Sequence, residues 1–370
     1  MSRSTKKIVW ITPDYFVSVD GPVIPLLIRH YEIDWIVVKT CGSLISADDP
    51  SGARVKARVW DLRFRQRDPR VIGQYLRMLL AVRRSTPDLV YISFHGMPYF
   101  LPLVCLMLNV SKVIYAVHNV QTPKGAVNEN SMRIYHYCVF KLIQMFHVFS
   151  KGQLRAISRL APAKKHFYAP FALQDYGRSQ ICAPGEVIRL LFFGHVRQYK
   201  RLDLLIEAFK DVYKSGITNI ELVISGDCDN WTHYRSLIAG AEGIKTRIEF
   251  IPAKDIPNVV GACHYVVLPY QDGAQSAVLT LAYQYSKPVI ASDIEALRQD
   301  VVEGRTGFLF RNGSRGSLAA VIREVVARHN AVYPDLTENV RQYAVREYSL
   351  ESIVARYRGL LDACLAESGV

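Results

Sequence analysis

Two loops in the second half of the chain carry residue types that suit a diphosphate. The first reads GHVRQYK from Gly194, lies between a strand-like and a helix-like run, and contains Arg197 and Lys200. Arginine offers a planar fork to phosphate oxygens, and lysine offers a mobile point charge. The second loop, GAQS at residues 273–276, leads into a helix-like run, and a helix N-terminus can hold a phosphate. A basic loop alone also fits a solvated surface, but two such loops in one half favour a binding site.

The elements that must position these loops are short apolar runs alternating with helix-like segments. Strands are predicted at residues 7–12, 35–39, 89–94, 112–118, 188–193, 221–225, 247–251 and 265–269. Helices are predicted at residues 71–84, 201–213, 277–285 and 350–365. The strands are apolar throughout and do not alternate, which is typical of parallel sheets buried on both faces. We therefore expect two doubly wound α/β domains facing across a cleft, with ligands beyond the carboxyl ends of the strands.

The domain boundaries follow from where this alternation stops and restarts. The stretch APFALQDYGRSQICAPGE breaks the pattern with proline, glycine and polar residues. We predict an N-terminal domain over residues 1–170, a linker over 171–187 and a C-terminal domain over 188–345. A last helix over 346–370 is expected to pack back across the linker onto the first domain.

Composition places the chain among globular proteins. It has 370 residues, of which half are apolar and about a fifth charged. The seven cysteines are odd in number and form no CxxC pair, which argues for reduced thiols in a cytoplasmic protein and against a disulfide framework or zinc site. The N-terminus does not read as a signal peptide. The longest apolar stretch, residues 97–110, is shorter than the roughly 20 residues a spanning helix needs. It fits either a core helix or an interfacial one.

Positive charge is concentrated in the first half. Residues 1–170 hold 24 Lys and Arg against 10 Asp and Glu, whereas the remainder holds 22 against 23. The densest stretch runs from Arg54 to Arg84. Two interpretations stay open: a solvated surface that aids solubility, or an attractive field for anionic lipid headgroups, nucleic acid or a phosphorylated partner.

At residues 192–209 the sequence FFGHVRQYKRLDLLIEAF resembles the strand–loop–helix signature of GT-B glycosyltransferases. It is most similar to the retaining family 4, the group 1 glycosyltransferases. The similarity continues through ELVISGD, DIPNVVGACHYVVLPY, SKPVIASD and VVEGRTGFLF, and it is strong over residues 188–311 and fainter in the first half. It implies a GT-B fold of two Rossmann-like domains and a UDP- or GDP-linked sugar as donor, with no other cofactor.

The resemblance assigns donor-side roles to the first loop. Lys200 matches the family lysine that contacts the donor diphosphate. His195 stands where the family has an arginine directly after Gly194, and Arg197 is the expected substitute. Arg201 replaces the glycine that usually follows the lysine.

The second loop departs from the common family pattern. Two glutamates that contact the sugar and the ribose in the family would fall at Gly273 and Leu281, so both carboxylates are missing. The chain instead matches a subgroup that carries PYxxxxQS, here residues 269–276. In that form the helix N-terminus would hold the diphosphate, and Asp272 is the candidate for a sugar hydroxyl. The expected diphosphate contacts are those of Gln275, Ser276 and Ala277.

The tripeptide Asp227-Cys228-Asp229 spells DxD, a metal motif of another glycosyltransferase fold. A three-residue match is common by chance, and the position corresponds to a GT-B turn near the donor, where Gly226 is expected to contact it. We expect no metal, because basic residues and a helix dipole can neutralise the leaving diphosphate.

In the first half, polar residues end two predicted strands. His118 and Asn119 follow one strand, and His95 follows another; Gly21 lies in the first strand–helix region. Similar transferases place a histidine next to the transferred sugar, which favours His118 as an essential residue. Gly21, His95 and Asn119 are acceptor-side candidates. A lone histidine is more often structural, and that alternative stays open for His95.

Together, these features predict a glycosyltransferase of the hexosyltransferase type, with His118, Arg197 and Lys200 as catalytic residues. The acceptor would be a glycan or a sugar on a polyprenyl diphosphate, in bacterial surface polysaccharide assembly, with retention and without metal. The basic first half would contact the anionic inner face of the plasma membrane. Rivals are a non-catalytic nucleotide-sugar-binding protein and another GT-B enzyme such as a sugar-nucleotide epimerase. No aromatic and basic interleaving supports a nucleic-acid partner.

Overall fold

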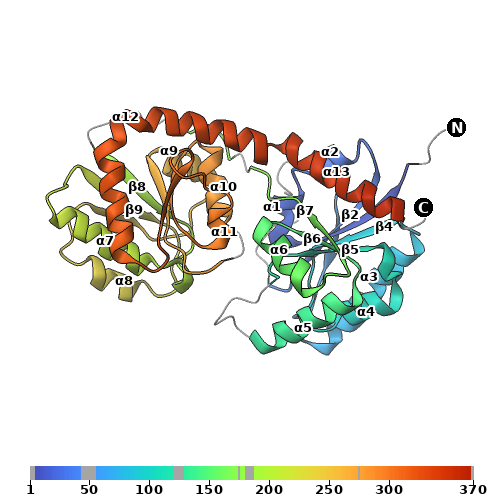
Figure 1. The fold of residues 1–370 in the computed structure, drawn as a ribbon. Helices are drawn as coiled ribbons and strands as arrows, with labels where there is room; N and C mark the ends of the chain where they lie inside the picture. The colour runs from blue at the N-terminus through green and yellow to red at the C-terminus, as the bar shows by residue number, and fades with distance from the viewer. Residues whose placement is uncertain are drawn as a thin grey trace. The chain divides into compact units, whose positions relative to one another are not determined.

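The computed structural model describes residues 5–42, 56–120, 129–173, 176–179, 187–273 and 276–367 of the chain. The chain forms two compact units (Figure 1). Unit 1 consists of Met1–Ala172 together with Leu350–Val370, and unit 2 is Leu173–Ser349. The last helix of the sequence therefore belongs to the first unit. Residues 174–175 and 180–186 of the expected linker lie outside the described residues.

A parallel sheet forms the centre of unit 1. Its described residues form seven strands in the order β3-β2-β1-β4-β5-β6-β7. The strands are β1 (Lys7–Pro13), β2 (Glu32–Lys39), β3 (Arg58–Asp61), β4 (Leu89–Ile92), β5 (Val113–Val117), β6 (Met145–Val148) and β7 (Lys165–Tyr168). The order runs outward in both directions from β1 and β4. The topological switch point, where open α/β sheets bind ligands, therefore lies between these two strands.

Helices cover both faces of this sheet because its strands are apolar on both sides. On one face lie α3 (Ile72–Arg84), α4 (Phe100–Met107), α5 (Glu129–Leu142) and α6 (Lys151–Leu160). On the other lie α1 (Val17–Asp20), α2 (Ile24–Leu27) and α13 (Leu350–Glu367) (Figure 1). Short 3-10 turns are η1 (Asp14–Phe16), η2 (Pro69–Val71) and η3 (Val110–Lys112). Along β1, Val9 and Ile11 pack against the first group, whereas Ile8 and Trp10 pack against the second.

Unit 2 repeats the plan. Within the described ranges it has six parallel strands in the order β10-β9-β8-β11-β12-β13, so its switch point lies between β8 and β11. The strands are β8 (Ile188–Phe193), β9 (Ile220–Ser225), β10 (Ile244–Arg247), β11 (Tyr265–Leu268), β12 (Val289–Ser292) and β13 (Gly307–Phe310).

The helices of unit 2 also divide between two faces. They are η4 (Gln198–Lys200), α7 (Leu202–Lys214), α8 (Trp231–Ile238), η5 (Ala253–Asp255), α9 (Ile256–Gly261), α10 (Ala277–Gln284), α11 (Glu295–Arg298) and α12 (Arg315–Tyr348). The first part of α12 packs with α7 on one face, and its last part packs with α9, α10 and α11 on the other. The long helix changes direction along its length (Figure 1), and it contains Pro334, which cannot donate the backbone hydrogen bond of a regular helix.

The predicted doubly wound architecture is confirmed in both units, but β3, β6 and β7 of unit 1 were not predicted and one strand of unit 2 is misplaced. The strand expected at residues 247–251 is β10, which ends at Arg247. β10 is the edge strand, so its polar Lys245 and Thr246 are tolerated at exposed positions. Phe250, in the apolar run that suggested a strand, is 78 % exposed and lies outside the core.

The apolar stretch at residues 97–110 contains α4. Phe100, Leu101 and Val104 are buried in the core, whereas Leu106 is 78 % exposed. No helix in the described part of the chain combines the length and the apolar content needed to cross a bilayer.

Candidate functional site

In unit 2, the loops that follow β8 and β9 are in direct backbone contact. The Gly194 N–H donates to the Ser225 carbonyl at 2.9 Å, and the Val196 N–H donates to the Asp227 carbonyl at 2.8 Å. Gly226 has φ of +143°, and a Cβ on it would lie 2.4 Å from the Gly194 oxygen. Only glycine can adopt this φ and also let its backbone come so close to Gly194, so the contact between the two loops depends on glycine at position 226.

Lys200 ends the short turn η4 and lies under these loops. The residue is only 8 % exposed, and its Nζ lies 5.7 Å from the centre of the Tyr270 ring. A Cβ on Gly194, which has φ of +90°, would lie 3.5 Å from the same Nζ. Burial lowers the pKa of Lys200 to about 8, and the charge of Arg197 adds to the effect. Within the described residues this ammonium has no carboxylate or carbonyl partner.

Lys287 shows how the same unit satisfies a buried lysine that has a structural role. It is 4 % exposed, and its Nζ donates to the carbonyls of Gly261 at 2.9 Å and Cys263 at 2.7 Å. Buried charges are normally paired in this way. Lys200 differs from Lys287 in this respect, because its buried ammonium has no such partner among the described residues.

The DxD carboxylates lie against the basic loop. Arg197 Nη1 donates to Asp229 Oδ2 at 2.7 Å. His195 lies between the two aspartates, 3.4 Å from Asp227 Oδ2 through Nδ1 and 3.4 Å from Asp229 Oδ2 through Nε2. Among the residues that the structure describes, no group of three or more His, Cys, Asp or Glu side chains is arranged to hold a metal ion.

Helix α10 begins beside this loop. Ser276 is its N-cap, and the Ser276 Oγ accepts from the Leu279 N–H at 3.2 Å. Ala277, the first helical residue, is exposed, so the start of the helix is open to solvent. Asp272 is exposed, and its Oδ1 accepts from the next N–H at 2.7 Å, which turns the carboxylate toward its own backbone. Gln275, the other expected contact, lies outside the described residues.

At the two positions where the resemblance implies glutamates, the structure does not favour a carboxylate. Gly273 has φ of +157°, a backbone conformation that residues with a side chain rarely adopt. Leu281 is 8 % exposed and packs in the core of unit 2. A carboxylate at the first position would strain the backbone, and one at the second would be buried without a partner.

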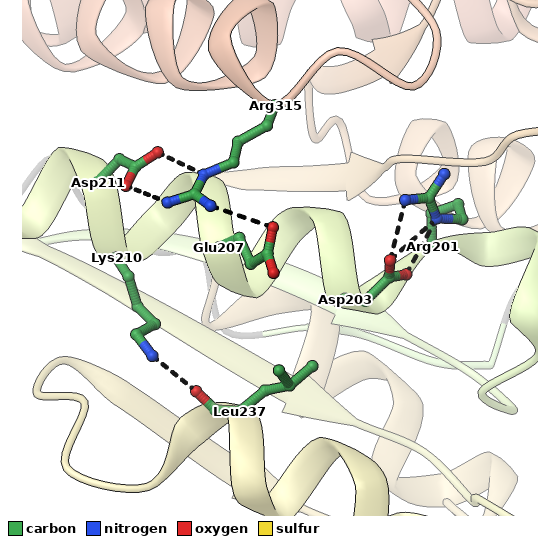
Figure 2. A network of polar contacts seen from close by, with 7 residues as sticks. All are labelled: Arg201, Asp203, Glu207, Lys210, Asp211, Leu237 and Arg315. Atoms are coloured by element: carbon green, nitrogen blue, oxygen red, sulfur yellow. Dashed lines mark hydrogen bonds and ion pairs between the residues drawn. The ribbon is translucent and has the colours of Figure 1, made fainter.

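Arg201 adopts the conformation that the usual glycine would adopt. Its φ is +49° and its ψ +48°, the left-handed region, which costs a residue with a Cβ roughly 1–2 kcal/mol. The guanidinium donates to Asp203 through Nε at 3.1 Å and Nη2 at 2.9 Å (Figure 2), and through Nη1 to Gln271 Oε1 at 3.2 Å. These contacts offset the strain and connect the loop after β8 to the loop after β11.

Glu207, one turn further along α7, belongs to a surface ion-pair network. Arg315, at the start of α12, donates to Glu207 at 3.2 Å and to Asp211 at 2.6 Å (Figure 2). This network joins two helices at the surface, which fits the structural role of Glu207.

In unit 1, His118 directly follows β5 and lies inside a group of aromatic rings. Its imidazole stacks on Phe16 at 4.2 Å between ring centres and meets His95 edge-on at 4.6 Å. Burial lowers the pKa of His118 to about 4, so the ring is neutral at physiological pH. Its Nε2 is buried and has no hydrogen-bond partner within the described ranges. Asn119, the next residue, is half-buried at the same strand end.

His95 is held by a hydroxyl network. Its Nδ1 shares a hydrogen bond of 2.7 Å with the Tyr115 hydroxyl, which lies 2.9 Å from the Tyr135 hydroxyl. Tyr135 in turn donates to the His95 carbonyl at 2.5 Å. Burial lowers the pKa of His95 well below its ordinary value, and neighbouring histidines add to this. The network fixes the face that His95 presents to His118.

The turn that contains Gly21 is anchored by the preceding residue, Asp20. Asp20 is fully buried, and its Oδ2 accepts from Trp10 Nε1 at 3.1 Å, Thr12 Oγ1 at 2.7 Å and Ser93 Oγ at 3.2 Å. These hydrogen bonds tie together the carboxyl ends of β1 and β4, the two strands at the switch point. Burial raises the pKa of Asp20 to about 6. Gly21 itself is buried, and its N–H closes α1.

Solved structures resemble the whole chain. The TM-score is 0.75 to a HepE protein of Anabaena in complex with UDP and glucose, at 14 % identity, with 97 % of this chain and 100 % of that chain covered. It is 0.76 to a sucrose-phosphate synthase of Thermosynechococcus elongatus, at 14 % identity, with 98 % and 99 % covered. This chain has the GT-B fold.

Sequence comparison places a glycosyltransferase domain in unit 2. Residues 188–328 match the family described as glycosyl transferases group 1. A GDP-mannose:glycolipid 4-beta-D-mannosyltransferase of Xanthomonas campestris pv. campestris is 28 % identical over 180 residues, which are 47 % of this chain and 49 % of that protein. An uncharacterized glycosyltransferase of Methanocaldococcus jannaschii is 21 % identical over 187 residues, 47 % of this chain and 45 % of that protein. The chain thus aligns with about half the length of these curated relatives, and the matches support the expected hexosyltransferase class.

Within this GT-B fold, unit 2 brings the expected donor-side residues to one edge. Gly194, Lys200 and Gly226 come from loops after β8 and β9, and Ser276 caps α10 after β11. The combination of an unpaired ammonium, an arginine and a helix N-terminus can bind a diphosphate. The sequence motif singled out these loops as the expected donor site, but it did not reveal the buried Tyr270 hydroxyl or the carboxylates beside His195 and Arg197.

Proposed function

We propose that this protein is a glycosyltransferase that transfers a sugar from a UDP- or GDP-linked donor to a glycan or lipid-linked sugar, in bacterial surface polysaccharide assembly. The observation that carries the proposal is the buried Lys200 ammonium at the switch point of unit 2, which has no partner among the described residues and lies near the start of α10. Support for the donor comes from the group 1 domain over these residues, and from a fold shared with a protein solved with UDP and glucose. Support for the acceptor comes from relatives named as glycolipid mannosyltransferases.

The chemistry assigned to unit 2 is stabilisation of the leaving group. As the bond between sugar and phosphate breaks, negative charge grows on the diphosphate. Lys200 and the α10 N-terminus are preorganised to stabilise that charge, and Arg197 joins them by exchanging Asp229 for a phosphate oxygen. These groups do the work that a metal does elsewhere, so the proposed reaction needs none.

The proposed stereochemical outcome is retention, with the leaving phosphate taking the proton of the acceptor hydroxyl on the same face of the sugar. Its support is the resemblance to the retaining family. For His118 we propose contact with the sugar or the acceptor: its neutral imidazole presents a nitrogen with no partner in the described residues. The relatives' name specifies a β-linked product, which makes the anomeric configuration the decisive measurement.

A donor screen tests the proposal. UDP-, GDP-, ADP- and TDP-sugars are added to the purified protein in EDTA, and thermal shift, product formation and the anomeric configuration by NMR are followed. We expect one nucleotide class to stabilise the fold and to support transfer to a glycolipid acceptor with the configuration of the donor retained. Binding without turnover would favour the non-catalytic alternative, to which the missing carboxylates at positions 273 and 281 point. Epimerised free donor would favour an epimerase, and an inverted product would overturn the retention proposal.

For the basic first half we propose peripheral contact with an anionic membrane. The stretch is exposed at Lys56, Arg58, Arg63, Arg65, Arg67, Arg70, Arg77, Arg83 and Arg84; Arg54 lies outside the described residues. The Tyr99 hydroxyl donates to the Arg67 carbonyl at 3.4 Å, so the start of α4 lies beside this stretch. Leu106 of α4 and Ile134 and Tyr137 of α5 are largely exposed, as apolar anchors would be.

Vesicle sedimentation tests this contact. The protein is expected to sediment with vesicles containing anionic phosphatidylglycerol at low salt and to be released as salt rises, because exposed charges are screened. Leu106→Glu should weaken the binding, whereas Val345→Glu, at an exposed apolar position in unit 2, should not. A protein that stays in the supernatant at every ionic strength contradicts the proposal.

A further inference from the structure

Tyr270, two residues after the end of β11, has a buried hydroxyl without a hydrogen-bond partner in the described part of the chain. The residue is 4 % exposed. Leaving a buried hydroxyl unpaired costs a folded protein about 1–3 kcal/mol, so such a group calls for a reason. In the same unit, Tyr283 of α10 shows the ordinary alternative. Its hydroxyl donates to the Asp300 carbonyl at 2.8 Å and lies 2.9 Å from Thr306 Oγ1.

The backbone of Tyr270 is fixed on both sides. Its carbonyl accepts from the Ser292 hydroxyl at 2.5 Å, and the next N–H, that of Gln271, donates to the Tyr199 carbonyl at 2.7 Å. The Tyr199 ring meets the Tyr270 ring edge-on at 5.9 Å. These contacts hold Tyr270 in place, so its ring is not free to turn toward another hydrogen-bond partner.

The groups around the ring define a positive site. Lys200 Nζ lies 5.7 Å from the ring centre. Ser276, the N-cap of α10, is close enough to act on the hydroxyl as a hydrogen-bonding group, which opposes the rise in the pKa of Tyr270 that burial causes. The contact lacks the geometry of a full hydrogen bond. The hydroxyl thus remains a proton donor at physiological pH. The Lys200 ammonium lies over its ring, and the N-cap of α10, the positive end of a helix dipole, lies close to the hydroxyl itself.

We infer that the Tyr270 hydroxyl donates a hydrogen bond to a phosphate oxygen of the nucleotide-diphosphate sugar, as a third donor beside the Lys200 ammonium and the N-terminus of α10. The inference rests on the proposed function and adds a residue to its donor site. A phosphate satisfies the ammonium and the hydroxyl together, whereas a neutral sugar hydroxyl would leave the ammonium unpaired. The hydroxyl is shielded from solvent in the free protein, so a rotation of the half-buried Ser276 side chain accompanies the contact.

Tyr270→Phe tests the inference because it removes one oxygen and keeps the ring. We expect the affinity for UDP or GDP, measured by calorimetry, to fall roughly 10- to 100-fold, the range for a hydrogen bond to a charged group. We expect the melting temperature of the free protein to rise, because an unpaired buried hydroxyl is gone. Binding of the corresponding nucleoside, uridine or guanosine, should not change.

Tyr283→Phe is the matched control, with the opposite expectation. It leaves the Asp300 carbonyl and the Thr306 hydroxyl without their partner, so the melting temperature should fall while nucleotide affinity stays at the wild-type value.

The possible outcomes separate the inference from the function on which it rests. If Tyr270→Phe binds UDP and GDP as the wild type does while Lys200→Met does not, the inference is overturned and the donor site stands. If Tyr270→Phe loses nucleoside affinity as strongly as nucleotide affinity, the hydroxyl has a structural role and the inference is overturned as well. If the wild type binds neither nucleotide, the proposed function fails and the inference fails with it.

Discussion

Lys200→Met is expected to lower sugar transfer by about 100- to 1000-fold and, at the same time, to stabilise the fold. The loss follows from removing a preorganised charge from the place where the leaving diphosphate becomes negative. The gain follows from burial. The pKa of Lys200 is lowered from 10.5 to about 8, so replacing the buried ammonium by an apolar chain of similar length can return up to roughly 3 kcal/mol.

The lowered pKa of Lys200 also predicts how nucleotide affinity depends on pH. Below pH 8 the free protein carries the Lys200 ammonium in its charged form, and this form attracts the diphosphate. As the pH rises through about 8 the amine becomes neutral, and donor binding must then take up a proton. Nucleotide affinity of the wild type should therefore fall above pH 8, and that part of the decline should be absent from Lys200→Met.

Lys287→Met provides the control for burial and shape. Its ammonium is bonded to two backbone carbonyls, so its loss should lower the melting temperature and leave nucleotide affinity unchanged. Calorimetric titration with UDP and GDP and a melting curve suffice for both variants. A Lys200→Met protein that binds and transfers as the wild type does would falsify the assignment of Lys200 to the donor site.

The architecture could be predicted from the sequence because parallel strands buried on both faces read as unbroken apolar runs. Ile188–Phe193 and Tyr265–Leu268 are such runs, and they became β8 and β11. The prediction failed at the edge of the sheet, where three of the four residues of Ile244–Arg247 are polar and the strand carries no such signal. Burial on both faces made β8 and β11 readable, and its absence hid β10. The buried strand β6 was also missed, because it has only four residues and one of them is the polar His147.

The candidate site could be predicted only in part, for a different reason. Local sequence showed that Lys200 sits in a loop before a helix, but not that its ammonium is buried with no partner among the residues that the structure describes. The pairing of Arg197 with Asp229 joins residues from two loops, and no spacing along the chain reveals it. Arg201 illustrates the same limit: its left-handed backbone explains the glycine of relatives only once φ is known.

Gly226→Ala is expected to destabilise unit 2 by more than about 3 kcal/mol and to lower transfer by roughly 100-fold. An alanine Cβ would lie 2.4 Å from the Gly194 oxygen and 2.6 Å from its carbonyl carbon. Both are backbone atoms, so no side chain can turn away, and the loop after β8 has to move. That loop carries Arg197 and leads to Lys200, and a displacement of the order of 1 Å is enough to spoil the positioning of catalytic groups.

Gly216→Ala is the control that separates the effect of the clash at Gly226 from the effect of backbone strain. Gly216 has φ of +94°, and a Cβ on it would meet nothing within 4 Å. The free energy of unfolding of its alanine variant should therefore fall only by the cost of the left-handed conformation, roughly 1–2 kcal/mol, and the variant should bind nucleotide normally. Chemical denaturation and nucleotide titration of both variants make the comparison. If the two alanine variants lose equal stability and both keep wild-type affinity, the packing of the β8 and β9 loops does not position the donor site. If Gly226→Ala alone loses affinity at a temperature where it is still folded, close backbone contact between the two loops is what places Lys200 beside α10.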